Sequence, residues 1–151
     1  MQETITIQDV FSILIELERS GAKHYEAMAA ISEEGPVRTL FQKLKEQEVI
    51  HEGIYRHHLT EIESIMFQET DQDYTNYLKG LIVQTFKMLS TLHETPNDQV
   101  GAFKALDLEK ETLFFLSELK LMLPASHTHW IEVIQGEERK HVTWILNYLN
   151  P

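Results

Sequence analysis

Residues 44–51 read LKEQEVIH and residues 134–141 read IQGEERKH, and these two stretches decide how the fold is interpreted. Each has a Glu four positions after an apolar residue and a His three positions after that Glu. Positions three and four apart share one face of a helix, so these polar side chains continue an apolar stripe that should face a core. The four residues are Glu48, His51, Glu138 and His141.

The two Glu-x-x-His pairs alone are close to what chance would produce, but an internal repeat indicates that they form a site. With eight His in the chain, roughly one such pair is expected by accident. However, Glu18 precedes Glu48 by 30 residues and Glu109 precedes Glu138 by 29, and each of these two Glu also lies on an apolar stripe. Glu16 and Glu111 point away from those stripes. Two helical hairpins therefore present the same three polar side chains in the same order.

Apolar residues recur at spacings of three and four along the whole chain, without sustained alternation, which predicts an all-α protein. Thr6 and Asp9 form a capping box at the start of the first helix, and Gly35-Pro36 separates it from the second. The predicted helices cover about 7–32, 36 to 67–70, 71–89, 99–122 and, after Pro124 and Ser126, the remainder to 149. We expect one domain over 1–151, with hairpins at about 7–67 and 98–149 joined by the 71–89 helix.

The composition excludes several classes of protein. The 151 residues include no Cys, which removes disulfides, thiolate metal sites and cysteine nucleophiles. A net charge of -11 disfavours nucleic-acid binding. Because no apolar run is long enough to span a bilayer and no signal peptide is evident, we expect a cytoplasmic protein that does not bind membranes.

Several stretches together resemble a known family. They are LERSGAKHY at 17–25, LFQKL at 40–44, ALDLEKE at 105–111 and the two Glu-x-x-His pairs. Over nearly the whole chain they resemble the rubrerythrin branch of the ferritin-like di-iron carboxylate family. This resemblance implies a ferritin-like four-helix bundle with an additional crossover helix, and a cofactor of two iron ions, for which manganese is an alternative because it accepts the same ligands.

The resemblance also implies a role for each of the six residues. Glu18 and Glu109 would be terminal carboxylates, Glu48 and Glu138 bridging carboxylates that also handle protons in catalysis, and His51 and His141 terminal nitrogen ligands. The chain departs from the family in two respects. It has no Cys and hence no rubredoxin domain, so electrons would come from an external donor such as a rubredoxin-like protein, and Thr112 stands where rubrerythrins have a further carboxylate.

Three functions follow as hypotheses. The first is a non-haem di-iron oxidoreductase that acts on peroxide or dioxygen, expected as a homodimer. The second is iron handling, in which ferrous ion is oxidised and then stored or delivered. The third is a metal-free helical interaction domain, in which the six side chains form salt bridges. The pattern does not assign Tyr25, His58, His127 or His129 to the site, because a buried Tyr is usually a core residue and surface His are common.

Overall fold

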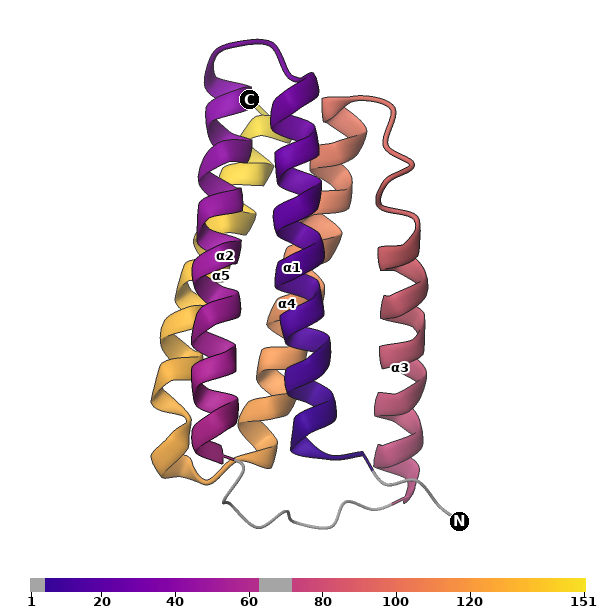
Figure 1. Ribbon diagram of the computed structural model, residues 1–151, viewed down its shortest axis with the longest axis vertical. Helices are drawn as coiled ribbons and strands as arrows, with labels where there is room; N and C mark the ends of the chain where they lie inside the picture. Colours follow the sequence, from indigo (N-terminus) through magenta and orange to yellow (C-terminus); the bar gives the residue numbers. More distant parts are fainter. Residues whose placement is uncertain (1–4, 63–71) are drawn as a thin grey trace.

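The computed structural model describes residues 5–62 and 72–151, and these residues form an all-helical bundle (Figure 1). They contain five α-helices and one short 3-10 turn, and no strand. The helices are α1 (Ile7–Ile31), α2 (Pro36–Ile62), α3 (Gln72–Ser90), α4 (Asp98–Met122) and α5 (His129–Leu149), with the turn at Ala125–His127. The prediction of an all-α chain is confirmed.

Local signals at the start of α1 and α2 explain where these helices begin. The backbone N–H of Thr6 donates to Asp9 Oδ2 at 2.8 Å, and the N–H of Asp9 donates to Thr6 Oγ1 at 3.2 Å, which completes the predicted capping box. Gly35 has φ +136°, a conformation that favours glycine, and Pro36 follows as the first residue of α2. The turn of the first hairpin is therefore built as the sequence indicates.

Some predicted boundaries differ from the structure or fall outside it. The predicted end of the second helix at 67–70, and Asp71 at the start of the third, lie outside the described residues. Ser126 does not begin the last helix: the 3-10 turn intervenes and α5 starts at His129. None of the described helices is both long enough and apolar enough to cross a membrane.

Four helices run side by side, and α3 lies along one flank of them (Figure 1). The hairpin of α1 and α2 packs against the hairpin of α4 and α5 through contacts of α1 with α4 and of α2 with α5. The helix α3 connects the two hairpins along the side of the bundle, as expected of a crossover helix. The structure thus has the predicted arrangement of a four-helix bundle with one additional helix.

The apolar core is divided into two clusters along the bundle. One contains Tyr25, Phe41, Ala105 and Ile145, and the other includes Phe11, Tyr55, Phe115 and Ile131. Between them, each of the four bundle helices places its buried acidic residue and, on α2 and α5, a His. The bundle therefore has a polar layer enclosed by apolar layers.

The buried face of α4 is rotated relative to the predicted stripe. Phe103 continues the apolar spacing of Leu106, Leu113 and Leu116 and would on that spacing face the core, yet it is 54% exposed. The reason is a close approach of α1: a Cβ on Gly101 would lie only 2.1 Å from Met28 Sδ. Small residues such as Gly101 and Ala105 therefore face α1, and the larger Phe103 faces outward.

Candidate metal centre

Six polar side chains from four helices meet in the polar layer, and each is at most 3% exposed. In a helical bundle these residues are buried because their spacing places them on the same faces as the core residues. The six are Glu18 from α1, Glu48 and His51 from α2, Glu109 from α4, and Glu138 and His141 from α5. The structure brings together every residue that the sequence predicted for the site.

His51 is held by carboxylates on both sides of its ring. Its Nδ1 lies 2.7 Å from Glu138 Oε1 and 3.8 Å from Glu18 Oε1, so this nitrogen faces the cluster. Its Nε2 lies 2.7 Å from Glu137 Oε2, and the Glu137 side chain is 40% exposed. A second carboxylate on the far nitrogen is the usual arrangement that orients a metal-binding His.

His141 faces the other half of the cluster. Its Nδ1 lies 3.1 Å from Glu138 Oε2, 3.5 Å from Glu109 Oε1 and 3.6 Å from Glu48 Oε1. The rings of His51 and His141 stack with centroids 5.5 Å apart. Glu138 therefore contacts both imidazoles with its two oxygens and occupies the middle of the cluster.

The cluster has the donors of a metal site. One ligand atom from each of four residues lies within 4.8 Å of the others, so these residues could hold a metal ion; they are Glu48, His51, Glu138 and His141. In the described part of the chain no hydrogen-bond donor reaches three buried carboxylate oxygens, which are Glu18 Oε2, Glu48 Oε1 and Glu109 Oε2. Buried oxygens without donors are costly in a protein, and a cation would satisfy them.

The four carboxylates cannot all be ionised in the metal-free cluster, and their pKa values diverge. Burial, reinforced by the charges of neighbouring carboxylates, raises the pKa of Glu18, Glu48 and Glu138 well above the ordinary range. Burial alone would also raise the pKa of Glu109, but hydrogen bonds to its neighbours outweigh burial and lower this pKa to about 2. Burial opposes the charged form of His141, yet hydrogen bonds to Glu109 and Glu138 raise its pKa to about 10.

Two buried tyrosines donate hydrogen bonds to Glu18 and Glu109, the carboxylates for which the resemblance implies terminal positions. Tyr25 Oη donates to Glu109 Oε1 at 2.8 Å, and Tyr55 Oη donates to Glu18 Oε1 at 2.8 Å. Burial, followed by the charge of the neighbouring carboxylate, raises the pKa of both phenols well above the ordinary range. Both hydroxyls therefore remain protonated and act as donors.

Gly21 makes room for one of the acidic side chains. It lies on the buried face of α1, and a Cβ built on it would be 3.2 Å from Glu48 Oε2. Such a distance is tighter than ordinary van der Waals contact. The absence of a side chain at this position therefore leaves the Glu48 carboxylate free to reach the middle of the bundle.

Sequence reasoning left some residues unassigned and missed others. It missed Tyr55, although its position four residues after His51 places it on the same face of α2, and it missed Glu137, for which the pattern offered no signal. It left Tyr25 open, and the structure places Tyr25 against Glu109.

The three His that the sequence pattern left unassigned do not reach the cluster. His58 stacks on Trp130 instead, and His127, in the 3-10 turn, and His129, at the start of α5, are exposed. Glu16 and Glu111 are also outside the cluster: they accept hydrogen bonds from Ser20 and Thr85, respectively.

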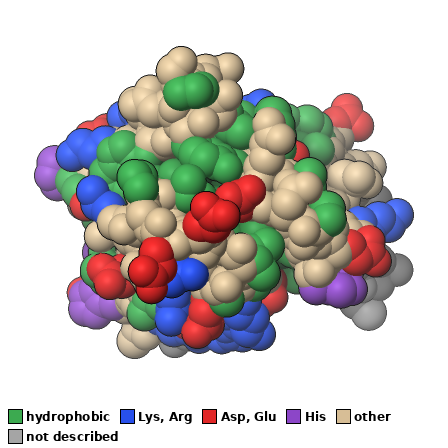
Figure 2. Space-filling model, turned by 90° about the horizontal axis from the view of Figure 1, so that it is seen from above, with side chains coloured by type: hydrophobic (Ala, Val, Ile, Leu, Met, Phe, Trp, Pro, Cys, Tyr) green, Lys and Arg blue, Asp and Glu red, His purple; other side chains and the backbone are tan. Residues whose placement is uncertain are grey.

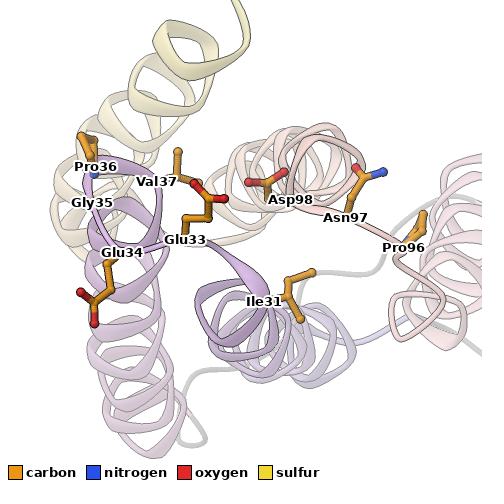
Figure 3. Close-up of a pocket in the computed structure, with 9 residues that line it drawn as sticks. All are labelled: Ile31, Glu33, Glu34, Gly35, Pro36, Val37, Pro96, Asn97 and Asp98. Atoms are coloured by element: carbon orange, nitrogen blue, oxygen red, sulfur yellow. The ribbon is translucent and has the colours of Figure 1, made fainter.

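A separate pocket of about 470 Å³ lies at the end of the bundle near the turn between α1 and α2. Figure 3 shows Glu33 and Asp98 on its two sides, whereas Glu34 points away. Acidic side chains are also exposed elsewhere on this end of the molecule (Figure 2). Acidic side chains close to the first turns of α2 and α4 interact favourably with the positive ends of these helix dipoles. This interaction accounts for the presence of the acidic side chains without a ligand.

Comparisons with family models, with curated proteins and with solved structures found no match. The function is therefore inferred from the geometry of the cluster.

Proposed function

We propose that the buried cluster is a dinuclear metal centre that binds two iron ions, and that the protein is a rubrerythrin-like oxidoreductase acting on peroxide or dioxygen. One observation carries this proposal: three carboxylate oxygens that no donor in the described part of the chain reaches lie in one buried cluster with the Nδ1 atoms of two imidazoles. Oxygen and imidazole nitrogen are donors that suit iron and manganese.

The donor arrangement supports two metal positions. His51 with Glu18 defines one side of the cluster, and His141 with Glu109 defines the other. Glu138 contacts both imidazoles, which is the placement that a bridging carboxylate requires. This support agrees with the roles that the resemblance implies, in which Glu18 and Glu109 are terminal ligands and Glu48 and Glu138 are shared.

The protein residues would prepare the site and move protons. When bound, the two ions supply electrons and open coordination positions to an oxygen substrate. Tyr25 and Tyr55 hold the outer carboxylates by hydrogen bonds, and the apolar clusters on either side exclude water. As the resemblance implies, Glu48 and Glu138 would also handle protons: in the metal-free cluster burial raises the pKa of both, so each carboxyl holds a proton that it releases when cations bind.

Anaerobic titration of chelator-treated protein with ferrous ion tests the proposal. We expect two ions per chain in the wild type and loss of binding in Glu48→Ala and Glu138→Ala. Glu16→Ala and Glu111→Ala are the matched controls, because both residues lie outside the cluster, and they should bind two ions. A wild type that takes up less than one ion per chain would show that the cluster is a metal-free salt-bridge network.

Two further measurements separate the oxidoreductase from iron handling. Turnover of peroxide with a one-electron donor supports the oxidoreductase. Iron storage requires a closed shell of many chains, so size-exclusion chromatography of the loaded protein would reveal it as a large assembly, whereas the proposed enzyme is expected to elute as a homodimer.

A further inference from the structure

A row of aromatic and imidazole side chains leads from the six-residue cluster to the surface. Tyr55, whose hydroxyl donates to Glu18 Oε1 at 2.8 Å, lies with its ring centroid 6.1 Å from that of Trp130. Trp130 in turn stacks on His58, with centroids 4.1 Å apart and planes only 8° from parallel. The His58 side chain is 21% exposed, so the row ends at solvent.

The residue types in this row are more costly to bury than Phe would be. Tyr55 is fully buried, and the indole Nε1 of Trp130 is buried with no acceptor within hydrogen-bonding distance among the described residues. An unpartnered buried N–H destabilises the fold, and Phe in its place would avoid that cost. What Tyr and Trp offer and Phe does not is the loss of one electron at a moderate potential.

The second Trp of the chain provides a contrast. Trp144 also lies near the cluster, with its ring 5.3 Å from that of His141, but Lys43 Nζ lies 3.9 Å from the centroid of the Trp144 ring. A positive charge on the face of an indole opposes removal of an electron from it. Burial lowers the pKa of His58, so the imidazole that stacks on Trp130 is neutral near pH 7 and has no such effect.

We propose that Tyr55, Trp130 and His58 form the route by which single electrons travel from an external one-electron donor at the α2–α5 end of the bundle to the cluster. This inference rests on the proposed function, because it requires an electron acceptor in the cluster. The chain has no Cys with which to hold an iron–sulfur cluster or a rubredoxin-type iron of its own, so the donor lies outside these 151 residues.

Each transfer balances in electrons and protons. One electron leaves the external donor, a one-electron reductant, and reaches the oxidised centre through the rings of His58, Trp130 and Tyr55 in that order. No ring is left oxidised and no proton moves, and the Tyr55 hydroxyl keeps its hydrogen bond to Glu18 Oε1. The net result is one electron moved from donor to centre, with every side chain restored.

The first experiment uses the full chain without metal, so it does not depend on the proposed function. Azide radicals generated by pulse radiolysis oxidise indoles by one electron, and absorbance follows the indolyl and phenoxyl radicals separately. In Trp144→Phe, which leaves Trp130 as the oxidised indole, we expect the indolyl radical to take an electron from Tyr55 and so convert to a phenoxyl radical at a rate independent of protein concentration. This transfer runs opposite to the proposed direction, but it uses the same contact between Tyr55 and Trp130.

The conversion should be lost when Tyr55→Phe is added to Trp144→Phe. Tyr25→Phe in the same background is the matched control, since Tyr25 is equally buried and also donates to a cluster carboxylate, and it should leave the conversion unchanged. Helical circular dichroism identifies variants that fail to fold. Conversion at the same rate in the Tyr55→Phe background would overturn the route.

The second experiment uses the iron-loaded protein and a one-electron dye as the reductant. Trp130→Phe should slow reduction of the centre by the dye, and Trp144→Phe should not. Both variants should bind two iron ions per chain. Equal reduction rates in the two variants would overturn the inference and leave the proposed function standing. Failure of the wild type to bind iron would instead overturn the proposed function, which the radiolysis experiment distinguishes.

Discussion

Replacing Glu48 with Gln should stabilise the metal-free protein while removing metal binding. Glu48 is 3% exposed, its Oε1 receives no hydrogen bond from the described residues, and burial together with repulsion by Glu109 raises its pKa well above 4.5. Gln has the same shape and no charge. The substitution therefore removes an electrostatic cost that only bound cations would otherwise offset.

The size and the sign of this effect follow from proton linkage. Below pH 4.5 the carboxyl is protonated in both the folded and the unfolded chain, so Glu48→Gln should have no electrostatic effect there. Above pH 4.5 the unfolded chain releases its proton and the folded chain retains it, which destabilises the wild type by about 1.4 kcal/mol per pH unit. At pH 7 the cost reaches at most about 3 kcal/mol. For a chain of this length that cost corresponds to roughly 6–12 °C in Tm.

Thermal unfolding with chelator present, followed by circular dichroism at several pH values from 4.5 to 7.5, measures this effect. Glu48→Gln should melt above the wild type by a margin that grows with pH, and the exposed Glu46→Gln on the same helix should not differ from it. With ferrous ion the order should reverse, because only the wild type gains binding energy. A Glu48→Gln variant less stable than the wild type at pH 7 would refute the reasoning and indicate a stabilising salt-bridge network.

Three more outcomes are expected. In the metal-free protein the His141 imidazolium contributes stability that is complete below pH 6.5 and is lost as pH rises towards its folded pKa of about 10. Urea unfolding should therefore show a free energy of unfolding that falls over that interval, and a flat profile would contradict the charged form of His141. Gly21→Ala should weaken metal affinity about tenfold, as measured by titration calorimetry, because the added methyl group crowds Glu48. Gly53→Ala, which has open space around it, should leave that affinity unchanged and stabilise α2 by about 0.5–1 kcal/mol, as measured by thermal unfolding. Glu137→Gln should reduce metal affinity roughly 10–100-fold by loosening His51, and an unchanged affinity would show that this carboxylate does not orient the ring.

Much of the fold and of the site was predictable because two signals agree. The spacing of apolar residues determines which helix faces are buried, and a charged residue on such a face is too costly to be accidental in six places at once. Glu18 and Glu109 could be predicted as site residues in this way, because each lies on an apolar stripe and each precedes a Glu-x-x-His pair by a similar number of residues. The structure brings both to the cluster.

The remaining features depend on how helices approach one another, which periodicity does not encode. The rotation of α4 follows from the contact between Gly101 and Met28 across two helices. Glu137 precedes Glu138 and would be expected on a different face, yet the crossing of α5 with α2 brings its carboxylate to His51. The apolar spacing of α5 indicates only that Trp130 faces the core, and its position between Tyr55 and His58 depends on where α2 and α5 meet.

The charge balance within the polar layer argues for cations from outside the chain. Every ion pair that the four cluster carboxylates make within the described residues is with His51 or His141, although the chain has 13 Lys and Arg. Two imidazolium groups could offset at most half of four negative charges. Two divalent ions would balance all four with the imidazoles neutral, the form in which His binds metals. Thr112, which lies on the same buried face and donates to the Leu108 carbonyl, adds no fifth charge, so the balance is complete at two ions.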